Sequence, residues 1–367
     1  MRCNRRAFWL VDLDLIWQRP PYSCGTAPAL HRTFPDSSHV FGCPASIGRR
    51  LHCAGVRIVS LLPSATEIVC LLGLEDQLVG VSADSDWPVE AVKRQPVLNT
   101  VSIDTSQLTS QEIDTAAGDG HRGASLYHVD SELLRHLRPD LILTQEICEV
   151  CAVSRRDVDL ATQTLGYTPR VLSLSPVTLD QVLEDVDLVA RTAGGVDHSA
   201  ELVHALRARL DSVRTRAAEL TRPRVFCMEW LDPPYTAGHW VPEMVDLAGG
   251  RDELGTPAGP SRRIDWQDVV AYAPEVLVLM PCSLELERVA AEFGLLRELP
   301  GWGNLPAAQS GQVYAGNTHL FSRSGPRLVD GVEALARMLH PERFSGPIPA
   351  HQALKVSFDG QRLEPYQ

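Results

Sequence analysis

A strand–helix–strand pattern occurs twice in this chain, and this repetition constrains the fold more than any other feature. Short apolar strands alternate with helices at 57–62, 64–73 and 78–81 in the first copy, and at 225–230 and 241–248 in the second. In the first copy Ser64 is followed three residues later by Glu67, the spacing of a capping box that opens a helix. Each copy is typical of a βαβ unit. The chain is therefore predicted to form two α/β lobes, each with a mostly parallel sheet.

Two consecutive helices are predicted between the lobes. The segment 179–192 has apolar residues at helical spacing and ends at Gly194, and a second helix is expected over 198–220. A helix of that length spans about 30–35 Å, so it is expected to bridge the lobes as a stiff rod that permits only a small closure. The predicted divisions are an extension at 1–55, a first lobe at 56–175, connecting helices at 176–221, a second lobe at 222–344 and a loose tail at 345–367.

The first 55 residues lack the pattern of the rest of the chain. The apolar stretch 7–17 is interrupted by Asp12 and Asp14, whereas a secretory signal needs an uninterrupted apolar core. Residues 18–55 are rich in Pro, Ser, Cys and Arg without periodicity, which predicts disorder or a stretch that is not translated in the cell. The nine cysteines give no disulfide framework. We therefore expect a cytoplasmic location, with a periplasmic or cell-surface location as the alternative.

Charge and hydropathy exclude two classes of partner. The formal net charge is -12 and no basic stripe with interleaved aromatics is present, which argues against nucleic acid. The longest apolar runs are far shorter than the roughly 20 residues of a membrane-spanning helix. We expect a monomer that neither binds nucleic acid nor spans a membrane.

The sequence lacks the main catalytic signatures. It contains no glycine-rich nucleotide loop, no nucleophile elbow and no zinc-binding helix motif, so binding without catalysis is expected. Aromatic residues instead follow the predicted strands, at Trp87, Trp230, Tyr235 and Trp240, and beside His319. Ligands of open α/β sheets bind at the strand ends. These residues therefore indicate a site for a large, flat and partly apolar ligand.

Five motifs, in this order along the chain, resemble those of the cobalamin-binding proteins of ABC importers. They occupy 58–67, 85–88, 137–143, 232–238 and 324–328, and the resemblance extends over 57–339. It implies an α/β fold of two Rossmann-like lobes joined by a long rigid helix, which is the class III periplasmic-binding-protein fold. It also implies that cobalamin, or a similar corrinoid, is bound in the cleft between the lobes as a ligand rather than as a catalytic cofactor. An ABC permease is then the expected partner.

The resemblance and the loop positions together give the expected ligand contacts. Trp87 and Tyr235 match aromatic positions that contact the ligand in the family. Arg323 matches a basic position at the cleft, and Gln145 replaces an aromatic residue of the transport members. Loop positions after strands add three further expected contacts: His239, Trp240 and His319.

Three carboxylates and two cysteines complete the expected site residues. Glu67 matches an acidic residue that pairs with arginine on the permease, and Glu243 or Asp246 is its expected equivalent on the second lobe. Cys148 and Cys151 form a Cys-x-x-Cys loop that resembles a subset of the family in which an export signal is often missing. They are expected to have a redox or cleft-lining role. No metal site is expected, because structural zinc needs four ligands and no second Cys-x-x-Cys exists.

Alternatives to uptake of a corrinoid remain open at this point. A ferric siderophore or haem receptor is one, because an anionic siderophore calls for clustered arginines and Arg262, Arg263 and Arg323 are available. Another is a cytosolic corrinoid-processing or redox protein that uses Cys148 and Cys151. A cytosolic carrier that holds cobalamin without any permease is a third.

Overall fold

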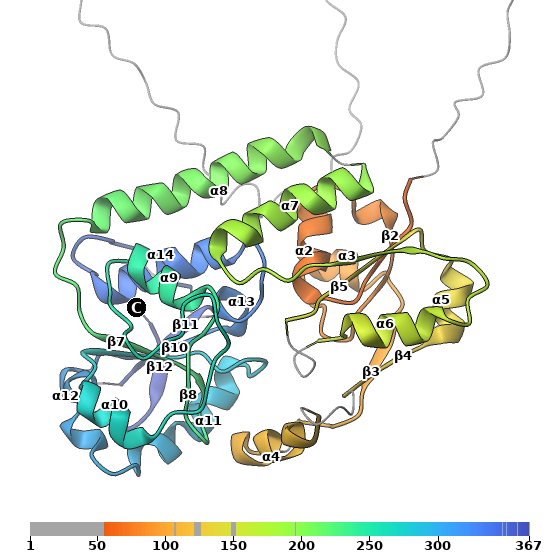
Figure 1. Cartoon of the computed structure of the whole chain (residues 1–367). Coiled ribbons are helices and arrows are strands. Elements are labelled where there is room, and N and C mark those ends of the chain that lie inside the picture. Colours follow the sequence, from red (N-terminus) through yellow and green to blue (C-terminus); the bar gives the residue numbers. More distant parts are fainter. Residues whose placement is uncertain are drawn as a thin grey trace, which may run out of the picture. The chain divides into compact units, whose positions relative to one another are not determined.

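The computed structural model describes residues 55–366, except 106–107, 121–125, 148–151, 195, 347, 350 and 358. In this part of the chain two α/β lobes are joined by two helices (Figure 1). No helix among these residues is long and apolar enough to cross a membrane. The two-lobed α/β architecture predicted from the repeated pattern is confirmed.

The first lobe is built on a parallel four-stranded sheet in the order β2-β1-β5-β6. Its strands are β1 (Ile58–Ser60), β2 (Leu78–Val81), β5 (Leu141–Thr144) and β6 (Arg170–Ser173). Its helices are α2 (Pro63–Leu71), α3 (Val89–Val92), α5 (Ser131–Leu137) and α6 (Arg155–Thr162), and a 3-10 turn, η1 (Glu75–Gln77), precedes β2. Both β1 and β5 are buried throughout, as central strands of a parallel sheet should be. A separate antiparallel pair, β3 (Asn99–Val101) and β4 (Tyr127–Val129), carries α4 (Ser110–Gly120) between its strands.

The second lobe contains a six-stranded sheet in the order β12-β11-β10-β9-β7-β8. Its parallel centre consists of β7 (Val225–Trp230), β9 (Val276–Leu279) and β10 (Val313–Gly316). The short strand β8 (Tyr235–Thr236) pairs antiparallel with β7 at one edge. The helical elements of this lobe are α9 (Val241–Leu247), α10 (Trp266–Tyr272), α11 (Leu286–Arg297), η2 (Trp302–Asn304), α12 (Pro306–Ser310), α13 (Thr318–Phe321) and α14 (Leu328–Leu339).

The helix α2 begins without the predicted capping box. Its N-cap is Leu62, which makes no side-chain hydrogen bond, and Pro63 occupies the start of the helix. Proline suits this position because the N–H that it lacks would have no acceptor within the helix. The Ser64 hydroxyl lies 3.3 Å from that of Ser324, and the Glu67 carboxylate binds arginines of the second lobe. The capping-box prediction is therefore wrong, because both side chains are engaged between the lobes.

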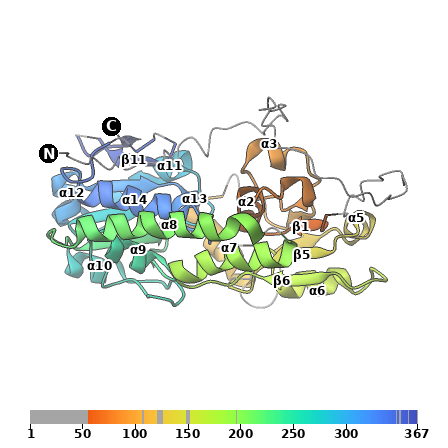
Figure 2. The ribbon, with the colours of Figure 1, turned by 90° about the horizontal axis from the view of Figure 1, so that it is seen from above.

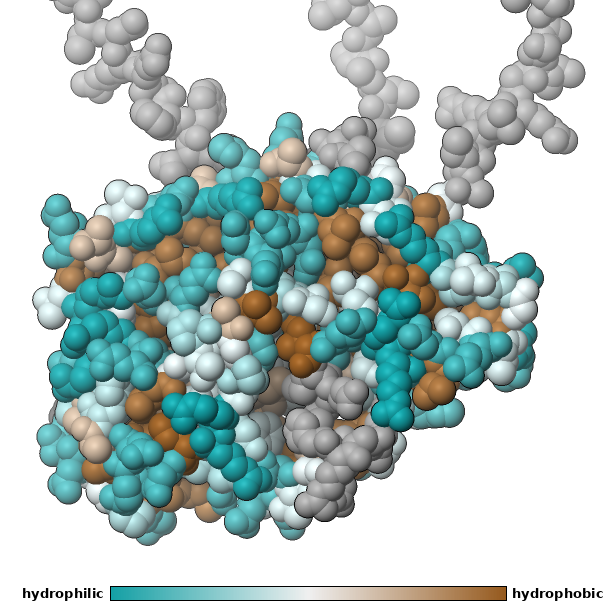
Figure 3. Space-filling model, viewed as in Figure 1, coloured by the Kyte–Doolittle hydropathy of each residue, from teal (hydrophilic) through white to brown (hydrophobic). Residues whose placement is uncertain are grey.

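Two helices, α7 (Leu179–Ala193) and α8 (Val196–Ala217), connect the lobes as predicted (Figure 2). They meet at Gly194, whose φ of 83° is the left-handed conformation that glycine adopts readily. The helix α7 packs on α2 of the first lobe and α8 packs on α14 of the second. Hydrophilic side chains follow the outer face of α8, with apolar ones beneath it (Figure 3). One apolar cluster runs from the first lobe through both helices into the second, so the two lobes share a core.

The end of the chain differs from the loose tail predicted over 345–367. There β11 (Ala353–Val356) and β12 (Leu363–Pro365) extend the second sheet by antiparallel pairing, with β11 on β10. Leu363 is 8% exposed and belongs to the apolar core of the second lobe. The prediction failed because the segment has few apolar residues and no clear period, while its stability comes from pairing with a preformed strand.

Replacing Leu363 with alanine is expected to destabilise the protein by about 2–4 kcal/mol, the usual range for removing a buried leucine side chain. Urea unfolding measures this change. Arg362→Ala is the matched control in the same hairpin, because its ion pair with Glu364 is exposed, and its unfolding midpoint should stay unchanged. Equal midpoints for both variants and the wild type would mean that the β11–β12 hairpin does not pack against the core of the second lobe.

Candidate functional site

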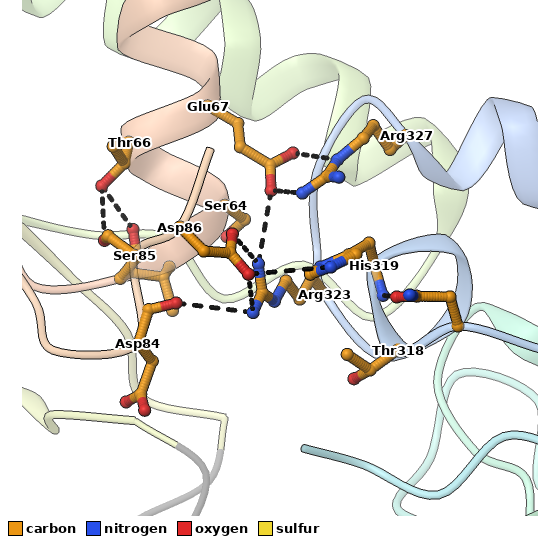
Figure 4. Close-up of polar contacts among 12 residues, drawn as sticks. Ser64, Thr66, Glu67, Asp84, Ser85, Asp86, Thr318, His319, Arg323 and Arg327 are labelled. Carbon is orange, nitrogen blue, oxygen red and sulfur yellow. Dashed lines mark hydrogen bonds and ion pairs between the residues drawn. The ribbon is translucent and has the colours of Figure 1, made fainter. Parts of the chain in front are cut away.

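Five charged or titratable side chains join the lobes directly, and we call this group the interlobe ion cluster. The cluster lies where the second-lobe segment after β10, from α13 to the start of α14, meets first-lobe residues of α2 and of the loop after β2 (Figure 4). Its members are Glu67, Asp86, His319, Arg323 and Arg327. Since β2 and β10 are parallel strands and both segments follow their carboxyl ends, the cluster occupies the position where ligands of open α/β sheets bind.

The innermost contact of the cluster pairs Glu67 with Arg327. The Nε atom of Arg327 donates to Oε2 of Glu67 at 2.9 Å, and Nη2 of the same guanidinium donates to Oε1. The Glu67 side chain is 2% exposed and that of Arg327 is 14% exposed. Nearby, a Cβ atom added at Gly325 would lie 3.2 Å from Cβ of Ser64, so the two backbones approach closely here. This geometry makes the pair a buried, bidentate bridge between the lobes.

The outer contact of the cluster pairs Asp86 with Arg323. Nη1 of Arg323 donates to Oδ1 of Asp86 at 2.6 Å and Nη2 donates to Oδ2 at 3.0 Å. The same Nη2 lies 3.4 Å from the carbonyl oxygen of Asp84. Buried hydroxyls hold the loop that carries Asp86, since Ser85 contacts both Thr66 and Ser82 at 2.9 Å.

His319 is held at the edge of the cluster by the start of α13. The side chain of Asn317 caps this helix and accepts from the His319 N–H at 2.9 Å. The imidazole Nε2 lies 3.6 Å from Oδ2 of Asp86. Burial, together with the positive charges of Arg323 and Arg327, lowers the pKa of His319 to about 4. His319 is therefore neutral at physiological pH and adds no positive charge to the cluster.

The pKa values of the two carboxylates in the cluster are shifted in opposite directions. Burial raises the pKa of Glu67, against the opposing hydrogen bond and charge of Arg327. Burial acts in the same direction on Asp86, but the hydrogen bond and charge of Arg323 outweigh it and lower the pKa of Asp86. Two further carboxylates, Asp84 and Glu285, are exposed and lie close enough to Arg323 for its charge to act on them. The two arginines of the cluster therefore face a surplus of acidic groups.

A second group of contacts joins the lobes through α4. The indole Nε1 of Trp230 donates to the Ser110 carbonyl at 3.0 Å, and the Ser110 N–H donates to Glu292 at 3.2 Å. The Tyr235 hydroxyl donates to Oδ1 of Asp114 at 2.9 Å, and Arg263 binds the other oxygen of the same carboxylate. α4 thus reaches from the hairpin of the first lobe to the β7–β8 edge of the second.

Several of the predicted ligand contacts lie at these two junctions. Trp87 is half-buried, and the guanidinium carbon of Arg327 lies 5.4 Å from its ring centroid. Arg323 and His319 belong to the interlobe ion cluster itself. Tyr235 lies at the α4 contact, and Nε of Arg263 donates to its hydroxyl at 3.1 Å. The structure brings Trp87, His319 and Arg323 together and keeps Tyr235 with α4.

The other three predicted ligand contacts are Trp240, His239 and Gln145. Trp240 is 5% exposed, and its indole N–H donates to the Phe321 carbonyl at 2.7 Å, so it packs in the core of the second lobe. Its contact with the ligand stays a prediction. His239 is half-buried with a positive φ of 51°, and burial lowers its pKa. Gln145 is buried after β5, where its amide donates to the Ala152 carbonyl at 3.3 Å.

The carboxylates predicted to dock on a permease have other partners. Glu67 is 2% exposed and paired with Arg327, whereas a carboxylate that docks on a permease must be exposed, so its docking role stays a prediction. Glu243 accepts the Leu179 N–H at 2.9 Å and so ties α9 to the start of α7. Asp246 is exposed and paired with Arg222. Cys148 and Cys151 lie outside the described residues, and among those described no group of three or more His, Cys, Asp or Glu could hold a metal ion.

Comparison with known proteins places this geometry in a family. The profile described as periplasmic binding protein matches residues 58–319. The chain is 27% identical to a vitamin B12-binding protein of Vibrio cholerae over 77% of this chain and 88% of that protein. It is 26% identical to an uncharacterized ABC transporter substrate-binding lipoprotein of Bacillus subtilis, YvrC, over 78% of this chain and 81% of that one. Among solved structures, a periplasmic heme binding protein from Pseudomonas aeruginosa gives a TM-score of 0.62 at 24% identity, covering 83% of this chain and 98% of that one.

These comparisons confirm the class III fold predicted from the sequence and correct one prediction. The relatives are described as a substrate-binding lipoprotein of an ABC transporter and as periplasmic heme-binding and vitamin B12-binding proteins, which points to a location outside the cytoplasm. The cytoplasmic location expected from the sequence is therefore wrong. That expectation depended on residues 7–17, which lie outside the described residues.

Replacing Glu67 with alanine is expected to lower the free energy of unfolding by about 3–5 kcal/mol, because Arg327 would be left buried without its partner. Chemical denaturation measures this loss. Asp246→Ala removes a carboxylate whose ion pair is exposed and should change stability little. A Glu67→Ala protein as stable as the wild type would contradict the structural role assigned to this pair.

The lowered pKa of His319 should make the stability of the protein depend on pH. Its pKa of about 4 in the folded protein lies below the ordinary value near 6.5, so the unfolded chain binds more protons between these values. The stability contributed by His319 is therefore present above about pH 6.5 and is lost as the pH falls toward 4. Between pH 7 and 4.5 the wild type should lose about 1–2 kcal/mol more stability than His319→Gln. Parallel pH profiles for the two proteins would contradict this assignment.

Proposed function

This chain belongs to the periplasmic binding protein family, and from that premise we propose that it binds a cobalamin-like corrinoid between its two lobes and delivers it to an ABC permease. No bond is made or broken in this role. Delivery to a permease takes place outside the cytoplasm, in keeping with the lipoprotein and periplasmic relatives.

The observation that carries the choice of a corrinoid is the charge balance at the interlobe junctions. Arg323 and Arg327 already face Asp86 and Glu67, and Arg263 faces Asp114. A polyanionic ligand would have to displace these carboxylates before it could pair with the arginines. A corrinoid presents amide side chains, whose NH2 groups donate hydrogen bonds to carboxylates and whose carbonyl oxygens accept them without an unpaired cation. Asp84 and Glu285, exposed beside the cluster, provide such carboxylates.

Trp87 supplies the apolar part of the proposed site. It lies half-buried beside Arg327 at the interlobe ion cluster and provides a flat surface for a ring system. Affinity would come mainly from burial of apolar area against a site that is already formed. The vitamin B12-binding relative supports the same ligand class.

Haem or a ferric siderophore is the second candidate, and one observation favours it. In the pair with Asp114 the Arg263 side chain is 62% exposed, and in the pair with Arg323 the Asp86 side chain is 43% exposed. In both pairs a ligand carboxylate can therefore take the place of the aspartate. The solved structure described as a periplasmic heme binding protein shares the fold. This candidate predicts tighter binding of the anionic ligands than of any corrinoid.

Calorimetric titration with cyanocobalamin, adenosylcobalamin, haem and a ferric hydroxamate decides between the two candidates. We expect corrinoids to bind at micromolar concentration or below, and haem and the hydroxamate to bind more weakly. Trp87→Ala should weaken corrinoid binding by about 1–3 kcal/mol, as for the loss of an aromatic anchor. Trp302→Ala, which removes a tryptophan stacked on Trp266 elsewhere in the second lobe, is the matched control. Absence of corrinoid binding, or equal losses in both variants, would contradict the proposed site.

A further inference from the structure

We propose that α4 is a strap that the first lobe extends onto the second, and that Asp114 is the positioning residue that fastens it and retains the bound ligand. The proposal rests on the proposed function, because the ligand is taken to lie between the lobes. Neither the matched family profile nor the resemblance described above assigns a role to this helix.

The connectivity of α4 gives it the form of a strap. It is inserted between β3 and β4, which form a two-stranded sheet apart from the main sheet of the first lobe. In Figure 1, α4 lies beyond this hairpin and beside the second lobe. Its contacts through Ser110, Ile113 and Asp114 are all with that lobe, and Ile113 packs against the second-lobe apolar core. The helix therefore belongs to one lobe by sequence and to the other by contact.

A helix with these properties depends on docking for its stability. α4 has 11 residues, and isolated helices shorter than about 12–15 residues are marginal in water. It also contains Gly118 and Gly120, and glycine is the weakest helix former after proline. Removal of its attachment to the second lobe should therefore loosen the helix itself.

Asp114 is the centre of that attachment. One oxygen accepts from the Tyr235 hydroxyl and the other pairs with Arg263, and its side chain is 14% exposed. Arg263 also donates to the Tyr235 hydroxyl, so the three groups form a closed hydrogen-bonded set. The Arg263 side chain is 62% exposed, so water can solvate its guanidinium when the ion pair with Asp114 breaks. The contact is specific in geometry and also reversible.

The ion pairs between the lobes differ in burial. The Glu67–Arg327 pair is almost wholly buried, whereas the Asp114–Arg263 pair is open to solvent on its arginine side. Asp114–Arg263 has the most exposed arginine of these pairs, so it is the pair that can open most easily while the lobes stay joined at α7 and α8.

The test uses the full chain and two readouts. Hydrogen–deuterium exchange of residues 108–118, without ligand, should be at least fivefold faster in Asp114→Ala than in the wild type. The dissociation rate constant of cyanocobalamin, measured by chase with excess ligand, should rise at least fivefold, with an association rate constant within about twofold. Tyr235→Phe keeps the ring and removes the hydroxyl, and should change both readouts in the same direction. Asp159→Ala, which breaks an exposed ion pair with Arg155 on α6, is the control and should change neither.

The outcomes separate the strap from the proposed function. Unchanged exchange in Asp114→Ala overturns the fastening role, whatever the ligand. Faster exchange with an unchanged dissociation rate overturns the retention role, as does a loss of affinity caused only by slower association. If the wild-type chain binds none of the tested ligands, both the proposed function and the retention role are contradicted. The hydrogen-exchange result still decides, independently of any ligand, whether Asp114 fastens α4.

Discussion

The buried pairing of Glu67 with Arg327 is the interaction on which the relation between the lobes depends. Two charges taken out of water are stable only when each has a well-placed partner, and here each lobe supplies one of the two. The bidentate geometry fixes the orientation of α2 relative to the start of α14 as well as their distance. If the lobes separated at this point while both groups stayed buried, the Glu67 carboxylate and the Arg327 guanidinium would each lose the partner that compensates the desolvation cost of burial.

The connecting helices reinforce this constraint. The apolar cluster that passes through α7 and α8 contains residues of both lobes, so the connection is part of the core and not a flexible linker. Arg209 of α8 adds a branched ion pair with Asp330 and Glu333 of α14, all three largely buried. A receptor joined in this way changes shape little on binding, and a preformed site loses little affinity to reorganisation. The contact of α4 with the second lobe lies outside this shared core, which is why we propose that this helix is the element that opens.

The sequence predicted the regular parts of this structure and missed those that depend on distant partners. The strands β1, β2 and β7 and the helices α2, α7 and α8 were predicted from the local pattern of apolar residues. The partners of Glu67 and Asp86 lie more than 230 residues away, so a local pattern led to a capping box where tertiary pairing holds the side chain. Trp240 has the loop position of a ligand contact, but its N–H finds a buried acceptor at Phe321. Strands β11 and β12 form because β10 offers an edge, which the sequence of the tail does not reveal.

The pKa values indicate that acid acts differently on the lobes and on the junction between them. Burial raises the pKa of Asp185 and Glu229 to about 7 and that of Asp252 to about 6. These groups bind protons more readily when folded, so they favour the folded state at low pH and lose this contribution as the pH rises from about 4 to their folded pKa values of 6 to 7. His319 has the opposite sign, because its pKa of about 4 depends on burial between the lobes. Within the interlobe ion cluster the raised pKa of Glu67 acts with these carboxylates, whereas the lowered pKa of His319 acts against them, so acid has opposing effects at this junction.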